Sequence, residues 1–109
     1  MKRGDIVTIA DPGGDFSRKP RPAIIVQSDV FNDTHASVTV CLITSHLTGQ
    51  ALFRLPLGAG DGTGLIVPSE IAVDKVQSVW AHRVGKRIGR VSDELLTILD
   101  QALRQWLAL

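Results

Sequence analysis

Residues 37–44 read Ser-Val-Thr-Val-Cys-Leu-Ile-Thr, and residues 23–28 read Ala-Ile-Ile-Val-Gln-Ser. Valine, isoleucine and threonine carry a branched Cβ that packs well on a pleated, half-buried surface, so such runs favour strands. Both stretches are therefore predicted to be β-strands, and residues 37–44 are expected to be a central strand of the sheet.

Shorter runs of the same kind predict further strands on either side of this pair. Two stretches dense in turn-forming residues separate them, Asp-Pro-Gly-Gly-Asp at 11–15 and a glycine-rich run at 58–64 that is expected to be a hairpin or mobile loop. The further strands are predicted at residues 5–10, 51–57, 65–67, 73–80 and 84–91.

Beyond Ser92, the apolar residues recur at helical spacing. The hydroxyl of Ser92 is suited to cap the start of a helix. Beyond this residue, no Gly or Pro occurs, and one amphipathic C-terminal helix is predicted. Many short strands followed by one helix indicate a mainly β fold with a C-terminal helix (α+β), in which a bent antiparallel sheet or open barrel packs on the helix. At 109 residues, the chain is expected to be a single domain spanning 1–109. The apolar face of the helix consists of Leu95, Leu99, Ala102, Leu103 and Trp106.

Charge is nearly balanced along the chain, with 12 Lys and Arg against 11 Asp and Glu, and a net charge of +1. This balance argues against a general polyanion binder. The cations are nevertheless clustered, which suggests a local contact with an anion such as a phosphate backbone. Charge alone favours the simpler interpretation, in which these are solvated loop and strand residues. The two clusters are Arg18, Lys19 and Arg21, and Arg83, Lys86, Arg87 and Arg90.

Motifs for several other chemistries are absent from the sequence. The glycine run lacks the Gly-x-x-x-x-Gly-Lys pattern of a phosphate loop, and no Gly-x-Ser-x-Gly elbow occurs. The three histidines are scattered and Cys41 is the only cysteine, so no metal-ligand spacing is present. The chain begins without a signal-peptide core, and no apolar stretch approaches the roughly 18 residues that span a bilayer. We expect a cytoplasmic protein without membrane contact.

Five sequence blocks occur in a distinctive order. They are Lys-Arg-Gly-Asp-Ile-Val at 2–7, Arg-Pro-Ala-Ile-Ile-Val-Gln-Ser at 21–28, Leu-Ile-Thr-Ser at 42–45, Asp-Lys-Val-Gln-Ser-Val at 74–79, and Gly-Arg-Val-Ser-Asp-Glu-Leu at 89–95. In order and spacing, and over essentially the whole chain, these blocks resemble those of the MazF/PemK toxins.

The resemblance implies an SH3-like, CcdB/PemK-type small β-barrel that forms a homodimer. It implies the toxin of a type II toxin–antitoxin system, an endoribonuclease that cuts single-stranded RNA at short motifs without a metal or other cofactor. The products would be a cyclic phosphate and a 5′-hydroxyl. The implied partners are RNA and a cognate antitoxin, with no DNA-specific binding by the toxin alone. Two alternatives stay open: a gyrase-poisoning toxin of the CcdB type, and a catalytically inactive barrel that binds RNA or antitoxin.

Two residues match the catalytic positions of the family. Arg21 would hold a permanent cation beside the phosphorane, whose negative charge grows in the transition state. Thr44 would hydrogen-bond the scissile phosphate and orient it for in-line attack. Asp74 falls where relatives carry an acid, and it fits a proton acceptor, a base-edge acceptor or an ordinary strand-edge carboxylate.

Further residues are expected to contact RNA. Ser45 and His46 follow Thr44 at the same strand end, and Lys75 replaces the glutamine usual in relatives, which shifts the site toward phosphate binding. The loop from Pro12 to Pro20 is expected to be a mobile flap over the RNA groove. Within that loop, Arg18 and Lys19 would meet RNA phosphates, and Phe16 fits either a base-stacking residue or a loop anchor.

Overall fold

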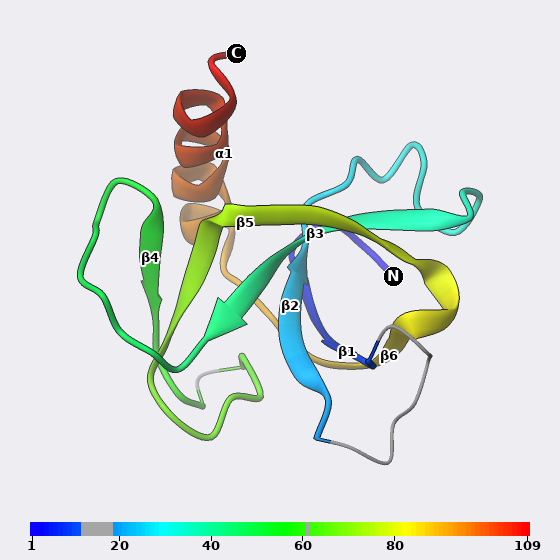
Figure 1. The fold of residues 1–109 in the computed structure, drawn as a ribbon, viewed down its shortest axis with the longest axis horizontal. Coiled ribbons are helices and arrows are strands. Elements are labelled where there is room, and N and C mark those ends of the chain that lie inside the picture. Colours follow the sequence, from blue (N-terminus) through cyan, green and yellow to red (C-terminus); the bar gives the residue numbers. More distant parts are fainter. Residues whose placement is uncertain (12–18, 61) are drawn as a thin grey trace.

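The computed structural model describes residues 1–11, 19–60 and 62–109, and their strands form one antiparallel sheet in the order β4-β5-β3-β2-β1-β6 (Figure 1). A single helix follows the last strand, so the predicted mainly β fold with a C-terminal helix is confirmed. The strands are β1 (Asp5–Ile9), β2 (Arg21–Ile25), β3 (Ser37–Thr44), β4 (Arg54–Leu57), β5 (Ser69–Trp80) and β6 (Val84–Arg90); η1 (Ala81–Arg83) is a 3₁₀ turn and α1 (Asp93–Leu107) is the helix.

The predicted bounds of β3 are confirmed, whereas other segments differ. The strand predicted at 51–57 begins only at Arg54, because the carbonyl of Gln50 accepts the N–H groups of Phe53 and Arg54 and forms a turn there. The prediction of a strand at 65–67 is wrong. The carbonyl of Leu65 instead accepts the N–H of Gly60 at 2.9 Å, so this segment folds back onto the preceding loop rather than onto a strand.

Both faces of the central strands are buried. On one face Ile6, Ile24 and Cys41 pack with residues of α1, and on the other Val7 and Ile25 pack with residues of β3 and β5. Successive strand residues point to opposite faces, so a strand buried on both sides needs apolar residues at every position. This explains the unbroken apolar run in β2.

The helix follows the local signals closely. The hydroxyl of Ser92 accepts the N–H of Leu95 at 3.2 Å and caps the first turn. Leu99 is fully buried against the sheet, and the ring of Trp106 lies 5.7 Å from that of Phe53. The amphipathic C-terminal helix is thus confirmed. Among the described residues, no helix is long and apolar enough to cross a membrane.

The glycine-rich segment 58–64 joins the two edges of the sheet. The edge strands β4 and β6 do not pair with each other, but the carbonyl of Gly62 accepts the N–H of Arg90 on β6 at 2.9 Å. A Cβ on Gly64 would overlap the backbone of Ile88, and one on Gly89 would overlap the backbone of Thr63. Glycine at 64 and 89 therefore lets the loop lie against β6 and close the curved sheet.

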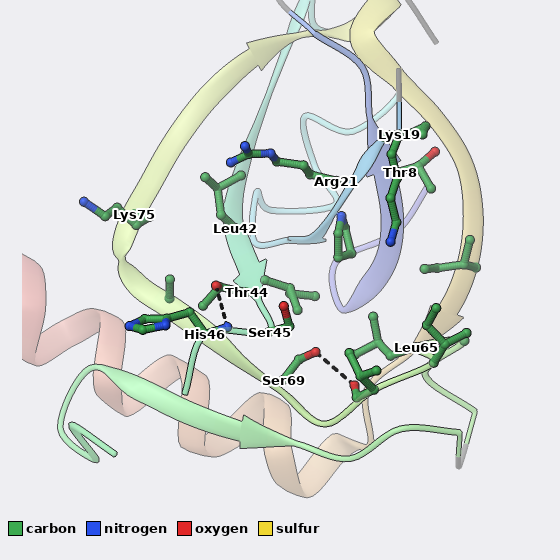
Figure 2. A pocket seen from close by; sticks show the side chains of 18 of the residues that line it. Thr8, Lys19, Arg21, Leu42, Thr44, Ser45, His46, Leu65, Ser69 and Lys75 are labelled. Carbon is green, nitrogen blue, oxygen red and sulfur yellow. Dashed lines mark hydrogen bonds between the residues drawn. The ribbon is translucent and has the colours of Figure 1, made fainter. Parts of the chain in front are cut away.

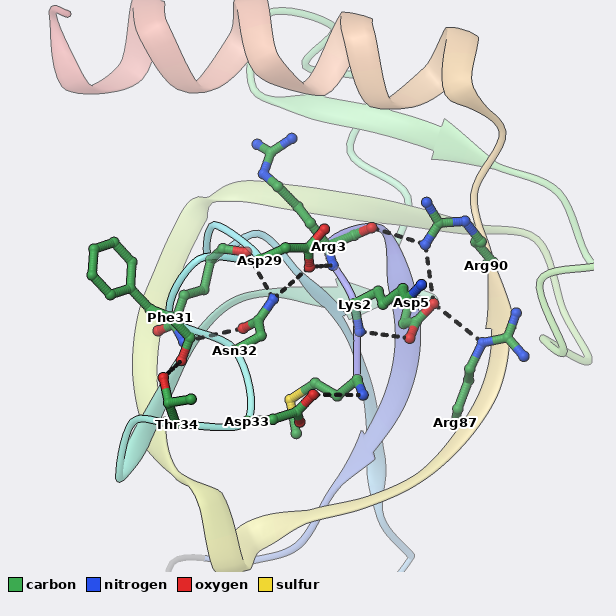
Figure 3. A network of polar contacts seen from close by, with 12 residues as sticks. Lys2, Arg3, Asp5, Asp29, Phe31, Asn32, Asp33, Thr34, Arg87 and Arg90 are labelled. Atoms are coloured by element: carbon green, nitrogen blue, oxygen red, sulfur yellow. Dashed lines mark hydrogen bonds and ion pairs between the residues drawn. The ribbon is translucent and has the colours of Figure 1, made fainter.

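The chain's first residues tie β1 to β6 and to the helix (Figure 3). The buried carboxylate of Asp5 accepts hydrogen bonds from the Lys2 N–H at 2.8 Å, Arg90 Nη1 at 3.1 Å and Arg87 Nε at 3.2 Å. Arg3 forms an ion pair with Asp100 of α1 at 2.7 Å. Burial raises the pKa of Asp5, but the three hydrogen bonds outweigh it and hold the pKa below its usual value.

Whether the loop closes the sheet can be tested by replacing two glycines that both have a positive φ. Gly64 has φ +74° and Gly60 has φ +70°, but a Cβ on Gly60 would meet nothing within 4 Å. We expect Gly60→Ala to cost about 1 kcal/mol from backbone strain alone. Gly64→Ala should cost at least about 2 kcal/mol, because it also separates the loop from β6. Urea denaturation measures both, and equal losses would rule out closure by close approach.

The Asp5 cluster is tested by Asp5→Asn, which is expected to lower the free energy of unfolding by about 2 kcal/mol at pH 7. Because folding lowers the pKa of Asp5, its contribution is present above the unfolded pKa and is lost as pH falls through the folded pKa. The difference between the two proteins should therefore shrink below about pH 4. Asp33→Asn is the control, since Asp33 is 64% exposed and should change stability by less than about 0.5 kcal/mol.

Candidate functional site

A pocket of about 790 Å³ lies where β2 begins and β3 ends (Figure 2). This volume is in the range of ligand-binding sites. Most of the residues predicted for the site line it: Lys19, Arg21, Thr44, Ser45, His46 and Lys75. A fourth cation, Arg54, also lines the pocket, and no Asp or Glu is among the described lining residues. The pocket is therefore suited to an anionic ligand.

Strand register places Arg21 and Thr44 on the same face of the sheet. Ala23 of β2 pairs with Leu42 of β3, and the two strands are antiparallel. Two residues beyond this pair, Arg21 and Thr44 lie at the same level on the same face, because side chains alternate with a period of two. Figure 2 shows the side chains of Arg21, Leu42 and Thr44 beside the same strand, with Leu42 between the other two. Among the described residues, Arg21 makes no hydrogen bond or ion pair, so its guanidinium is free for a ligand.

The hydroxyl of Thr44 is held in place by the backbone that follows it. Its Oγ1 accepts the N–H of His46 at 3.0 Å, which is drawn as a dashed line in Figure 2. A hydroxyl that accepts one hydrogen bond still has its own hydrogen to donate. Thr44 is therefore oriented by the turn at Ser45 and His46 and can donate into the pocket.

A bulge in β5 positions Asp74 and Lys75. Cys41 and Leu42 are neighbours on β3, but their partners on β5 are Val76 and Ala72. The three intervening residues of β5 have no partner on β3, and β5 turns sharply in Figure 1 between its two paired parts. Bulges bend a strand and change the direction of its side chains. Lys75 consequently lines the pocket.

Asp74 pairs with Arg54 rather than lining the pocket. Its Oδ1 accepts from Arg54 Nε at 2.7 Å and its Oδ2 accepts from Nη2 at 3.1 Å, so both carboxylate oxygens are engaged. The hydrogen bonds and the positive charge of Arg54 lower the pKa of Asp74. Sequence reasoning missed Arg54, because nothing local marks an arginine in a short edge strand as a partner of Asp74.

The remaining predictions concern residues outside the described part of the chain and the second basic cluster. Arg18 and Phe16 belong to residues 12–18, which lie outside the described residues, as does most of the predicted flap. In the second basic cluster, Arg83 donates two hydrogen bonds to the carbonyl of Ala10, while Arg87 and Arg90 bind Asp5. These three arginines have structural partners, which differs from both the predicted phosphate contact and the solvated residues of the simpler interpretation. Among the described residues, no group of three His, Cys, Asp or Glu side chains could hold a metal ion.

Known proteins share both the sequence and the fold of this chain. A family model described as PemK-like, MazF-like toxin of type II toxin–antitoxin system matches residues 2–107. The chain belongs to this family. It is 38% identical to the probable endoribonuclease MazF of Mycolicibacterium smegmatis, over 100% of this chain and 98% of that protein. It is 34% identical to endoribonuclease MazF9 of Mycobacterium tuberculosis, over 95% of this chain and 93% of that protein.

Solved structures agree with this family assignment. The toxin MazF-mt6 of Mycobacterium tuberculosis superposes with a TM-score of 0.77 and 27% identity, over 94% of this chain and 96% of that chain. MazE–MazF from Deinococcus radiodurans gives a TM-score of 0.80 over 100% of this chain and 96% of that chain. At 22% identity, the second likeness concerns the fold alone. The predicted MazF/PemK-type fold is confirmed.

A second residue missed in the sequence, Glu70, holds the segment that follows Thr44. Glu70 pairs with Thr44 across β3 and β5, and it is buried. Its Oε1 accepts from the backbone and hydroxyl of Thr48 at 3.0 and 3.2 Å, and its Oε2 accepts the N–H of Gly49 at 3.1 Å. The pKa of Glu70 is lowered, and the hydrogen bond from the Thr48 N–H is the largest cause. This family member thus uses a strand carboxylate to fix the loop that carries Ser45 and His46.

Replacing Glu70 with Gln should loosen this loop, because an amide offers one acceptor oxygen and turns an N–H toward other donors. Hydrogen exchange at the amides of Thr48 and Gly49 is expected to accelerate, while that of Val40 in β3 stays unchanged. Folding lowers the pKa of Glu70, so in the wild type these two amides should be fully protected above the usual glutamate pKa. Their protection should be lost as pH falls through the pKa of Glu70 in the folded protein, below about pH 4. Glu94→Gln at the exposed start of α1 is the control, and loop protection equal to that of the wild type in Glu70→Gln would contradict the assignment.

Proposed function

We propose that this chain is the toxin of a type II toxin–antitoxin pair and cuts single-stranded RNA at short motifs without a metal ion. The supporting observation is a pocket with four cations and no carboxylate lining it among the described residues, in which Arg21 and Thr44 share one face. Relatives at 38% and 34% identity are named endoribonucleases.

The reaction proposed is a transfer within the RNA. The 2′-oxygen of a ribose bonds to the adjacent phosphorus while the bond from phosphorus to the 5′-oxygen breaks. The products are a cyclic phosphate and a 5′-hydroxyl, so the 2′-hydroxyl loses a proton and the 5′-oxygen gains one. Arg21 stabilises the extra negative charge on the phosphorane, since a guanidinium donates to two oxygens at once.

Thr44 orients the phosphate in this proposal. Its oxygen is held by the N–H of His46, and its hydrogen is free to bind a non-bridging phosphate oxygen. A donor fixed on a rigid strand favours in-line geometry, because it does not have to be ordered when substrate binds. Ser45, His46, Lys19 and Lys75 then contact the flanking RNA, with Lys75 binding phosphate where relatives carry glutamine.

Proton transfer from the 2′-hydroxyl needs a base with an available lone pair and a pKa suited to the working pH. Asp74 is the first candidate predicted from the sequence. Arg54 engages both of its oxygens and lowers its pKa, and Asp74 does not line the pocket. These contacts favour an orienting role for Asp74 over proton transfer.

The proposal extends to the partners of the toxin. One solved structure of the same fold is described as an endoribonuclease in complex with its cognate antitoxin. A cognate antitoxin is proposed for this chain on that basis. A homodimeric state and action on RNA in the cytoplasm are proposed from the resemblance to the MazF/PemK family.

Cleavage of mixed-sequence RNA in EDTA tests the proposal, with mapping of the new ends. The wild type should cut at a recurring short motif and leave cyclic phosphates. Arg21→Ala is expected to lower the rate at saturating RNA by about 10²–10³-fold. Thr44→Val, which removes only the hydroxyl, should lower it about 10–100-fold.

Arg104→Ala is the matched control, because Arg104 is an exposed arginine on α1 outside the pocket. It should cut like the wild type. An inactive wild type that inhibits gyrase would instead identify a gyrase-poisoning toxin. An inactive wild type that binds RNA or antitoxin would identify a binding barrel. Full activity of Arg21→Ala would overturn the catalytic role of Arg21.

A further inference from the structure

Arg54 lies at the far side of the pocket from Arg21. It pairs with Ala72 of β5, Ala72 pairs with Leu42 of β3, and Leu42 pairs with Ala23 of β2. Directly opposite residues in a sheet share a face. This row therefore crosses the pocket from β4 to β2, and Arg21 lies two residues from its β2 end. The two arginines stand at opposite ends of one continuous surface.

The guanidinium of Arg54 is held in one orientation. Nε and Nη2 bind the two oxygens of Asp74, and the side chains of Arg54 and Asp74 are only 13% and 16% exposed. A bidentate pair fixes the plane of the guanidinium as well as its position. Its Nη1 makes no hydrogen bond to any described residue. An arginine kept rigid from one side, with donors left over on the other, is preorganised for a second anion.

The charges around Arg54 favour an anionic ligand. Lys75 follows the residue that orients Arg54, and it also lines the pocket. Among the described residues, the two acidic groups that act on Arg54 both have partners of their own, Asp74 in Arg54 itself and Glu70 in Thr48 and Gly49. Neither carboxylate lines the pocket. An anion entering from the pocket therefore meets cations first, while the carboxylates lie behind them.

We propose that Arg54 binds a phosphate of the RNA strand other than the one cleaved, and that Asp74 is the positioning residue that holds Arg54 for this contact. The inference rests on the proposed function, since the ligand is the RNA of that same pocket. The strand would cross β3 and β5, with the scissile phosphate at Arg21 and Thr44 and a flanking phosphate at Arg54. Asp74 then acts through Arg54 and does not accept the proton.

Salt dependence of binding tests the phosphate contact. The probe is a short labelled RNA of mixed sequence, 2′-O-methylated throughout so that it cannot be cleaved. Each phosphate contact on a single strand contributes about 0.7 to the slope of log affinity against log salt. Arg54→Gln should weaken binding about tenfold and lower the slope by about 0.7. Arg54→Lys, which keeps the charge, should restore the slope, and Arg104→Gln should leave affinity and slope unchanged.

A double-mutant cycle tests the role of Asp74. If Asp74 acts only through Arg54, Asp74→Asn should raise KM for cleavable RNA, and Arg54→Gln with Asp74→Asn together should be no worse than Arg54→Gln alone. In Asp74→Asn, the rate at saturating RNA should stay within about threefold of the wild-type rate, and its pH profile should keep the wild-type shape. Urea denaturation of each variant shows whether the protein remains folded under the assay conditions.

Three results would overturn the inference. An unchanged salt slope in folded Arg54→Gln would make Arg54 a structural partner of Asp74 only. A collapse of the saturating rate in Asp74→Asn, with loss of one limb of the pH profile, would make Asp74 the proton acceptor. Additive effects in the double variant would show that Asp74 and Arg54 act independently of each other. Failure of the proposed function is distinct, because the wild type would then cut no RNA at all.

Discussion

The residues of β5 between Ala72 and Val76, which have no partner on β3, impose the bend on which the rest of the architecture depends. A strand twelve residues long that pairs with both β3 and β4 must follow the curvature of the sheet, and the bulge supplies this change of direction. Because β5 bends there, the short edge strand β4 is carried round toward β6. The glycine-rich loop can then reach β6 and join the two edges. The same bend directs Lys75 to the pocket and Asp74 to Arg54.

Closing a sheet protects its edges, since exposed backbone N–H and C=O groups invite pairing with other chains. In this chain the closure is made by a loop instead of by direct strand pairing. The N–H of Arg90 donates to Gly62, and the small size of Gly64 and Gly89 lets the backbones approach. A glycine-rich run that superficially suggests a phosphate loop thus has a packing role. The pocket proposed to bind RNA lies mainly at the start of β2 and the end of β3, and Gly64 is the described residue of the glycine run that lines it.

The distribution of charge explains how a nearly neutral chain presents an electropositive pocket. Three carboxylates bind cations or backbone donors: Asp5 binds Arg87 and Arg90, Asp74 binds Arg54, and Glu70 binds the turn at Thr48 and Gly49. Each of these acids has a lowered pKa, because hydrogen bonds favour its charged form. They stay ionised and bind structural partners, while Lys19, Arg21 and Lys75 line the pocket and form no hydrogen bond or ion pair with a described residue.

The sequence alone determined the parts of this protein that depend on neighbours along the chain. The cap at Ser92, the apolar face of α1 and the bounds of β3 follow from local propensity and periodicity. The ordered family blocks also marked Arg21 and Thr44, which register then places on one face. Only the tertiary structure decided that residues 65–67 are not a strand, that the glycine run closes the sheet, and that Asp74 binds Arg54. The first feature depends on the hydrogen bond from the Gly60 N–H to the Leu65 carbonyl, which forms within the loop. The other two depend on which segments meet after the sheet curves, and residues twenty or more positions apart carry no local signal of that meeting.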